Sequence, residues 1–477
     1  MNNKLITLLQ TFSKEDITQF KKFVNSSYFN ENESVNNLLE LLIPFLNAPE
    51  PNFKKLTKEK IWGKLFHKTA FVDTKYRRLF SDLNKLAAQF LSHESFAEPI
   101  TQQINLLKIY NRPELEKHYN FTLNTIEELF KNEKQSPDFY YNKLQFSEQQ
   151  HLFSEQITKN KPTNFDYIES ADYSLECFYV LQKLKFYCDN LGYNNLYKKT
   201  FKSIQHIDFI LENLEQSEVI KETVVYAYSL VIKLLDNPKE DQNYFLLKNI
   251  LAEKSNFIDP AELEILYTHL RNFCIIYKIN LGYNEYIKEL FEIFKIQLSK
   301  NLLLKNNVLN VQNYKNIITV ALRVKAFDWL EQFIKDYTSK LPEQEQTNAL
   351  SYNLANVYFF QKKFTKVIEQ LRFVEFNYSN YALGSKLLLI RTYYELGEYN
   401  ALDSLLESFR IYLLRNKQLT KETKMQYSTI IRMIKKLSNI NPNNKGQIKE
   451  LAEKIRSSEN NVAKQWLLDK IEELEKS

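Results

Sequence analysis

Apolar positions between residues 313 and 410 recur on one template. Three copies align, with spacings of 37 and then 35 residues between them. Within each copy the apolar columns follow one another at the short steps of a helix face, interrupted once by a polar turn. The aligned columns are Ile317, Leu354 and Leu389; Ile318, Ala355 and Ile390; Ala321, Tyr358 and Tyr393; Phe327, Phe364 and Tyr399; Leu330, Val367 and Leu402; and Ile334, Leu371 and Leu406. The pattern predicts three consecutive helical hairpins whose column side chains form a core rather than a ligand site.

These columns resemble the tetratricopeptide repeat, best over residues 313–410. The first copy supplies Tyr314, Ile317, Phe327 and Pro342, the second Leu354, Ala355, Tyr358 and Phe364, and the third Tyr393, Gly397 and Tyr399. The chain departs from the family's pattern at the small positions of the helix contacts, which hold Ile318, Ile390, Leu330, Val367 and Leu402. The resemblance implies an all-α fold, a right-handed α-α superhelix of tetratricopeptide-like hairpins. Because one hairpin leaves its apolar side uncovered, neighbouring hairpins are expected to stack into a solenoid with a groove.

Polar breaks divide the helical pattern into three predicted parts. Residues 1–95 form an N-terminal helical module, in which Ser13 and Asp16 are spaced for a capping box. Residues 96–440 form the helical-repeat solenoid, which is entered through a linker at residues 91–99. The polar sequence NINPNNKG marks the start of the last part, residues 441–477. Its two amphipathic helices have charged faces that suit the terminal cap of a solenoid.

One string of five residues occurs twice. Residues 190–194 and 280–284 both read Asn-Leu-Gly-Tyr-Asn, and Phe201 and Phe291 keep the same offset of 90 residues. Glycine suits the left-handed backbone conformation that often ends a helix. We therefore expect Gly192 and Gly282 to occupy equivalent turns.

Composition narrows the fold class and the compartment. Six glycines among 477 residues leave few positions for the positive φ that β-hairpin turns need, which favours helices. The cysteines Cys177, Cys188 and Cys274 form no CxxC pair and no even set, so a disulfide framework is not expected. The sequence shows neither a signal-peptide apolar region nor a membrane-spanning apolar run. We expect a cytoplasmic protein without membrane contact.

Motifs typical of catalysis or cofactor binding are missing from the sequence. There is no glycine-rich phosphate loop, and no two of the six histidines stand four residues apart. Glu148 and His151 have the spacing of a di-iron ligand pair, but such a site needs a second pair and two further glutamates. We interpret them as an exposed polar face, and predict no catalytic, cofactor-binding or metal-ligating residues and no enzyme activity.

Positive charge gathers near the N-terminus. The formal net charge is +6, and residues 51–90 alone hold ten basic and three acidic residues. Tyr76, Leu79, Phe80, Leu83 and Leu86 mark the apolar side of a predicted helix over residues 73–91. Four basic side chains lie on its other side and form the candidate electrostatic contact surface: Lys75, Arg77, Arg78 and Lys85.

Two interpretations of this basic hairpin, residues 54–85, remain open. Its two helices with a short break are similar to a helix-turn-helix and suit nucleic acid or an acidic partner. The other interpretation is a solvated face of an amphipathic helix pair. Residues 8–24 also resemble the first two helices of pyrin-type death-fold domains.

The expected function is a non-enzymatic scaffold or adaptor that holds a peptide or protein in the solenoid groove. The alternative is a nucleic-acid-associated regulator that uses residues 54–85 and senses a partner through the repeats.

Overall fold

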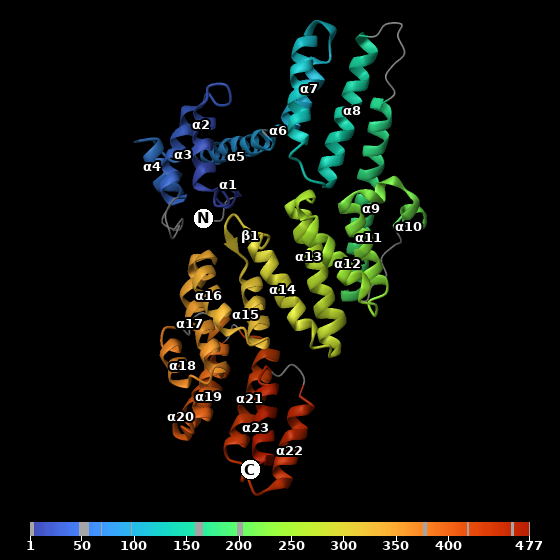
Figure 1. The fold of residues 1–477 in the computed structure, drawn as a ribbon. Coiled ribbons are helices and arrows are strands. Elements are labelled where there is room, and N and C mark those ends of the chain that lie inside the picture. Colours follow the sequence, from blue (N-terminus) through green and yellow to red (C-terminus); the bar gives the residue numbers. More distant parts are fainter. Residues whose placement is uncertain are drawn as a thin grey trace. The chain divides into compact units, whose positions relative to one another are not determined.

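The computed structural model describes residues 4–46, 57–67, 69–96, 98–157, 166–197, 204–374, 379–416, 419–458 and 462–476. Over these residues the protein is all-α apart from one two-stranded hairpin (Figure 1), so the predicted fold class is confirmed at this level. No helix in the described part is both long and apolar enough to cross a membrane. The chain divides into two compact units, residues 1–190 with 199–226 and residues 191–198 with 227–477. The domain boundaries predicted at residues 95 and 440 stay predictions.

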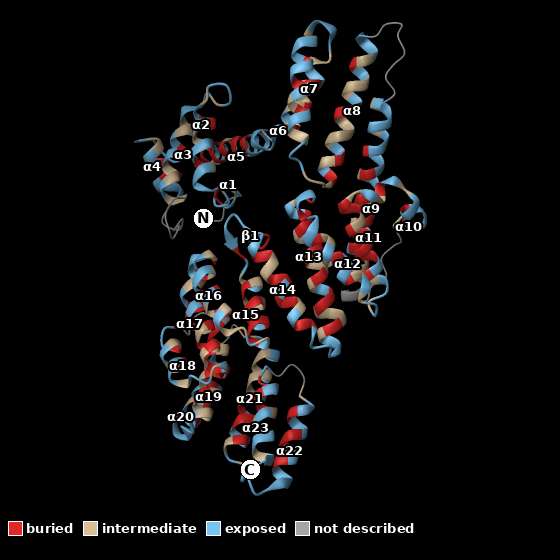
Figure 2. Ribbon diagram, in the orientation of Figure 1, coloured by how far each residue is buried: buried red, intermediate tan, exposed pale blue. Residues whose placement is uncertain are grey.

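Ten α-helices lie in the first unit within its described residues, apart from the last turns of the ninth, and an eleventh begins at its end. They are α1 (Lys4–Leu9), α2 (Lys14–Asn25), α3 (Glu33–Leu46), α4 (Lys58–Leu65), α5 (Asp73–Phe96), α6 (Pro99–Tyr110), α7 (Glu116–Phe130), α8 (Pro137–Ile157), α9 (Asp166–Tyr197), α10 (Ile207–Asn213) and α11 (Thr223–Asp236). Helices α1 to α5 enclose one apolar core, and α6 to α8 enclose another. Figure 2 shows the buried residues as stripes along the helices, as amphipathic helices require.

Local signals in the N-terminal sequence set the helix boundaries. Ser13 and Asp16 form the predicted capping box at the start of α2, each side chain accepting a hydrogen bond from the other residue's backbone N–H. Thr57 caps α4, and its side chain accepts a hydrogen bond from the Lys60 N–H at 3.3 Å. Helix α5 continues to Phe96, so most of the linker predicted at residues 91–99 is helical. Helix α5 packs against α2 in the core of this unit, where the rings of Phe20 and Phe90 lie with centroids 5.3 Å apart.

The second unit carries the rest of the elements. They are α12 (Gln242–Glu253), α13 (Pro260–Asn272), a π-helix (Phe273–Lys278), α14 (Tyr286–Ser299), β1 (Leu304–Lys305), β2 (Val308–Leu309), α15 (Val311–Arg323), α16 (Phe327–Tyr337), α17 (Glu343–Phe360), α18 (Phe364–Leu371), α19 (Ser379–Leu396), α20 (Tyr399–Arg415), α21 (Lys421–Ser438), α22 (Lys445–Arg456) and α23 (Lys464–Lys476). Helix α23 contacts α19 through two hydrogen bonds, which Trp466 Nε1 and Lys470 Nζ donate to Glu395 at 2.6 and 2.9 Å.

The three hairpins predicted from the apolar columns are present as α15–α16, α17–α18 and α19–α20. The columns of Ile318, Leu330 and Ile334 are buried in all three copies. The aromatic column of Phe327 is less buried and begins the second helix of each hairpin. The exposure of its side chains differs between copies: Phe364 is half-buried, whereas Tyr399 is 51% exposed. The periodicity therefore predicted the hairpins and most of their buried face.

The same turn joins the two helices of each hairpin. The residue with positive φ is Lys325, Lys362 or Gly397, at φ 59°, 60° and 72°. The next residue has φ between −80° and −90° and ψ between 58° and 63° in all three turns. Its backbone N–H donates to a carbonyl in the last turn of the first helix, in the pairs Ala326 to Ala321, Lys363 to Tyr358 and Glu398 to Tyr393. Such a bond closes a helix end of the Schellman type.

One short β-hairpin interrupts the helices. Strands β1 and β2 pair antiparallel, with Leu304 opposite Leu309 and Lys305 opposite Val308. Its two turn residues, Asn306 and Asn307, have φ of 50° and 61°. Asparagine tolerates the left-handed region and favours this two-residue turn. Scarcity of glycine therefore predicted the dominance of helices, but it did not exclude a hairpin built on asparagine.

The expected equivalence of Gly192 and Gly282 is wrong. Gly282 has φ 98° and ends a helix, as expected, and Tyr283 N–H donates to the carbonyl of Lys278 behind it. Gly192 instead lies inside α9, which continues to Tyr197. The residues that precede the two strings differ: Lys278 corresponds to Cys188 at the offset of 90 residues. The ammonium of Lys278 lies 5.5 Å from the Tyr283 ring and supports the turn, whereas Cys188 offers no cation. Phe201 lies outside the described residues.

Candidate functional site

The four predicted basic residues lie on the exposed side of α5. Tyr76, Leu79, Phe80, Leu83 and Leu86 are buried, which turns the opposite side of the helix to solvent. The side chains of Arg77, Arg78 and Lys85 are 73, 86 and 73% exposed. Lys75 is also exposed, and its ammonium lies 4.5 Å above the Phe66 ring. Their predicted exposure is confirmed, while their function stays a prediction.

Two carboxylates on α5 compensate much of this charge. Asp73 forms ion pairs with Lys58 at 3.0 Å and with Arg77 at 2.6 Å. The hydrogen bond from Lys58 is the main reason that the pKa of Asp73 is lowered. Asp82 lies 3.9 Å from Arg78 and 3.8 Å from Lys85. The described part of residues 51–90 holds seven basic and three acidic residues, because Lys54, Lys55 and Lys68 lie outside it. The ion pairs of Asp73 and Asp82 thus offset part of the positive charge on this side of α5.

A second basic surface, on α21 and α22, was missed by the sequence analysis. Residues 421–456 hold nine basic and three acidic residues, a net charge of +6. A groove of about 510 Å³ lies along these two helices, and four of the cations line it: Arg432, Lys435, Lys436 and Lys454. Counting charge in windows along the whole chain would have found it. Helix α21 falls within the predicted solenoid of residues 96–440, and α22 falls within the predicted cap of residues 441–477, where charged outer faces needed no further explanation.

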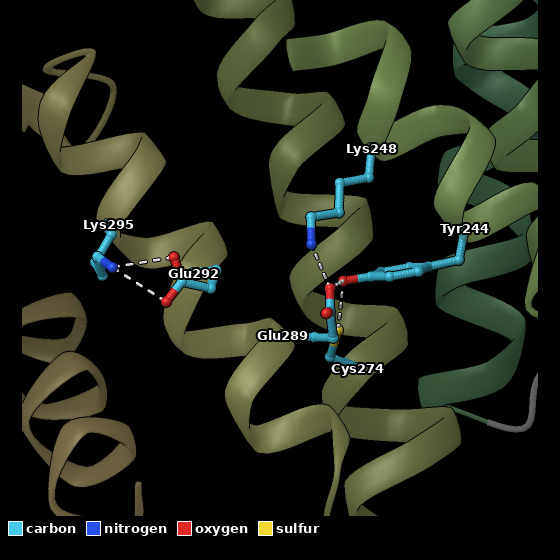
Figure 3. Close-up of polar contacts among 6 residues, drawn as sticks. All are labelled: Tyr244, Lys248, Cys274, Glu289, Glu292 and Lys295. Carbon is cyan, nitrogen blue, oxygen red and sulfur yellow. Dashed lines mark hydrogen bonds and ion pairs between the residues drawn. The ribbon is translucent and has the colours of Figure 1, made fainter. Parts of the chain in front are cut away.

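A partly buried polar cluster joins α12, the π-helix and α14 (Figure 3). Tyr244 Oη and Lys248 Nζ both donate to Glu289 Oε2, at 3.0 and 2.5 Å, and Cys274 Sγ lies 3.5 Å from Tyr244 Oη. Burial raises the pKa of the Cys274 thiol to about 12 and also raises the pKa of Tyr244. Both groups stay protonated at neutral pH, which suits a structural network rather than a nucleophile. Lys295 and Glu292 in the same view form an exposed pair on α14 alone.

Lys278 anchors the π-helix beside this cluster. It is 5% exposed and forms an ion pair with Asp241 at the start of α12. Its ammonium also lies within 5.5 Å of the ring centroids of Phe273, Tyr283 and Tyr286. A buried cation needs such compensation, since its removal from water is unfavourable. The arrangement explains the local fold, because the cation has partners at the start of α12, on the π-helix itself and at the start of α14.

A similar network occurs in the first unit. Glu222 accepts hydrogen bonds from Tyr140 at 2.8 Å, Tyr173 at 2.8 Å and Gln135 at 2.6 Å. Burial raises the pKa of the nearby Cys177 thiol to about 12. The Gln135 side chain also accepts from the Val224 N–H at 3.0 Å and so joins the start of α8 to α11. This cluster is likewise a satisfied structural network.

Glu148 and His151, which the sequence indicates as an exposed polar face, both lie on α8, where Glu148 is exposed and His151 is half-buried. His151 Nε2 lies 3.5 Å from Glu155, one turn further along α8. Across the described ranges, no group of three or more histidine, cysteine, aspartate or glutamate side chains is arranged to hold a metal ion.

No known protein family, curated protein or solved structure matches this chain. The resemblances to the tetratricopeptide repeat and to pyrin-type domains therefore stay untested by relatives. The candidate sites rest on the chain's own geometry, and the two basic surfaces are the features of that geometry that face solvent.

Proposed function

We propose that the protein is a non-enzymatic interaction scaffold or adaptor. In this proposal the hairpins of residues 311–415 stack as a right-handed, tetratricopeptide-like superhelix, and its groove holds a peptide or a protein partner. The observation that carries the proposal is the recurrence of one turn, at Lys325, Lys362 and Gly397, between helices that bury the same columns. Identical turns and identical buried faces are what a stack of equivalent hairpins requires.

The surface of the hairpins supports a protein partner. Large apolar side chains remain exposed along them: Leu350, Phe360, Leu396, Tyr399, Ile411 and Leu414. Aromatic side chains are enriched at protein interfaces, and the buried centre of an interface is more apolar than the rest of the surface. The polar networks around Cys177 and Cys274 support a structural interpretation, because protonated buried thiols are inert.

We place this scaffold in the cytoplasm. Cys177, Cys188 and Cys274 are buried and form no disulfide bond in the described structure. Reduced, unpaired cysteines are typical of proteins that fold in a reducing compartment.

The proposal is tested with the intact, tagged protein expressed in its own cells. Captured material is treated with nuclease, cross-linked through lysine amines and analysed by mass spectrometry. The proposal expects a protein that stays bound after nuclease treatment and cross-links to lysines of the hairpins, such as Lys315, Lys363 and Lys366. Recovery of nucleic acid as the main bound material, or cross-links confined to α4 and α5, would contradict it.

The second candidate function is a nucleic-acid-associated regulator. The exposed Arg77 and Arg78 favour it, because arginine is the usual donor to phosphate. Their pairing with Asp73 and Asp82 weakens it, since these ion pairs have to open before a phosphate is bound. We rank it below the scaffold for this reason.

A further inference from the structure

The most positively charged stretch of the second unit lies on α21 and α22. The net charge of +6 over residues 421–456 equals that of the whole 477-residue chain. The remaining residues therefore sum to zero, although they include the basic hairpin at residues 51–90. Charge on this scale sets up an attractive field for anions near the surface.

The groove on these helices has a charged rim and an apolar floor. Arg432, Lys435 and Lys436 project from one face of α21, and Lys454 faces them from α22. Leu451, which is 4% exposed, and half-buried Ile440 form the apolar part of the lining. Asn439 and Gln447 add side-chain amides.

The cations of α21 are only partly compensated: Lys435 adds to Arg410 in lowering the pKa of Glu407, and Lys436 adds to Lys454 in lowering the pKa of Glu450. Glu450 is the one carboxylate that lines the groove, and it is paired with Lys454. No described carboxylate forms an ion pair with Arg432, Lys435 or Lys436, and Arg432 donates hydrogen bonds to Ser428 and Thr429 of its own helix. Arg432 stands three residues before Lys435 and four before Lys436, spacings at which like charges destabilise a helix. On α5, by contrast, Asp73 and Asp82 pair with the arginines.

We propose that this groove binds a short acidic peptide segment of a partner protein. Carboxylates of the segment would pair with Arg432, Lys435 and Lys436, and an apolar side chain between them would rest on Leu451 and Ile440. The apolar floor favours a peptide over a nucleic-acid backbone, which offers charge without an apolar side chain to cover these residues. The amides of Asn439 and Gln447 suit the hydrogen-bonding groups of a peptide backbone. The size of the groove lies within the usual range for ligand sites.

This inference rests on the proposed scaffold function and names the chemistry of one partner segment. The test measures binding of a fluorescein-labelled peptide of repeating Glu-Glu-Leu to the full chain. Fluorescence anisotropy of the peptide reports the binding. We expect binding that weakens as salt is raised, since the contacts are exposed charges. The variant Arg432→Gln, Lys435→Gln, Lys436→Gln is expected to bind roughly tenfold more weakly or worse, from three contacts of ordinary surface strength. A peptide of repeating Glu-Glu-Ser is expected to bind more weakly than the leucine peptide.

A matched control removes the same charge elsewhere in the second unit. Lys239→Gln, Lys254→Gln, Lys288→Gln changes three exposed lysines outside the groove and is expected to keep the affinity within about twofold. Circular dichroism and thermal unfolding verify that both triple variants are folded. The proposal is overturned if the acidic peptide does not bind, if both variants weaken it equally, or if the serine peptide binds equally well. Tighter binding of duplex DNA, lost in the Arg432 variant, would overturn the peptide assignment.

Failure of this inference is distinguishable from failure of the scaffold function. If a captured protein still cross-links to lysines of residues 311–415 while the acidic peptide fails to bind, only the proposal that the groove of α21 and α22 binds acidic peptides is refuted. If no nuclease-resistant protein is captured, the scaffold function itself falls.

Discussion

Lys362 and Gly397 hold the same position in successive hairpins, with φ of 60° and 72°. A left-handed backbone is unfavourable for a residue with a Cβ atom and unstrained for glycine. Lys362 therefore adopts a conformation that Gly397 adopts freely, and the fold tolerates it because the turn's hydrogen bonds are the same. The two residues provide a direct experiment on the turn.

Exchanging these residue types is expected to shift stability in opposite directions. Gly397→Ala should lower the free energy of unfolding by about 1 kcal/mol, because alanine meets the left-handed strain. Lys362→Gly should raise it by less than about 1 kcal/mol, because glycine's greater freedom in the unfolded chain offsets part of the gain. Urea unfolding of the two variants checks both signs. Equal destabilisation by both would show that the turn conformations are not equivalent.

The two glycines of the repeated string provide a second matched pair. Gly282→Ala should destabilise by about 1 kcal/mol because of its φ of 98°. Gly192→Ala should stabilise by roughly 0.5–1 kcal/mol, because Gly192 lies in a helix and a Cβ there meets no heavy atom within 4 Å. Thermal unfolding measures both effects: the melting temperature should fall for Gly282→Ala and rise for Gly192→Ala. Destabilisation by Gly192→Ala would restore the original expectation that this glycine ends a helix.

The periodicity of apolar residues predicted more of the fold than did the repeated five-residue string. The columns around Ile318 and Leu330 predicted three hairpins, because a buried helix face needs apolar residues at fixed steps. The string shared by Gly192 and Gly282 failed because a helix end depends on the preceding turn, where Lys278 has no counterpart in the first copy. The ion pairs of Asp73 and Asp82 follow from i, i+4 spacing and were predictable from sequence. The groove lined by Lys436 and Lys454 was not, since it depends on how α21 and α22 pack.

Large-to-small substitutions within the hairpins should report the burial of each column. Leu371 is 2% exposed, so Leu371→Ala should lower the free energy of unfolding by roughly 2–5 kcal/mol. Phe364 is half-buried against Phe359, so Phe364→Ala should cost less than the Leu371 substitution. Tyr399→Ala, at the equivalent but exposed position, should change stability by less than about 1 kcal/mol. Denaturant unfolding ranks the three, and a loss under about 0.5 kcal/mol for Leu371→Ala would mean that the buried face is misplaced.

Stability should fall on mild acidification because of His269. Burial in α13 lowers its pKa from 6.5 to about 4, so the folded state resists protonation while the unfolded chain accepts a proton near pH 6.5. The stabilisation is complete above pH 6.5 and is lost as the pH falls from 6.5 towards 4. Between pH 7.5 and 5 the loss should be about 2 kcal/mol. The difference between the parent protein and His269→Gln, measured by urea unfolding at both pH values, isolates this contribution. An identical pH dependence in the two proteins would refute it.

The basic surface of α5 separates the two function classes. If Lys75, Arg77 and Arg78 bind phosphates, affinity for duplex DNA should fall by about 0.9 logarithmic units per contact for each tenfold rise in salt. Arg77 and Arg78 already pair with Asp73 and Asp82, so a phosphate has to displace these carboxylates. We therefore expect no duplex binding through this surface at physiological salt. Lys75→Gln, Arg77→Gln, Arg78→Gln should leave thermal unfolding nearly unchanged, because exposed pairs contribute little. Salt-sensitive binding of DNA or RNA that this triple variant abolishes, while the Arg432 variant retains it, would favour the regulator over the scaffold.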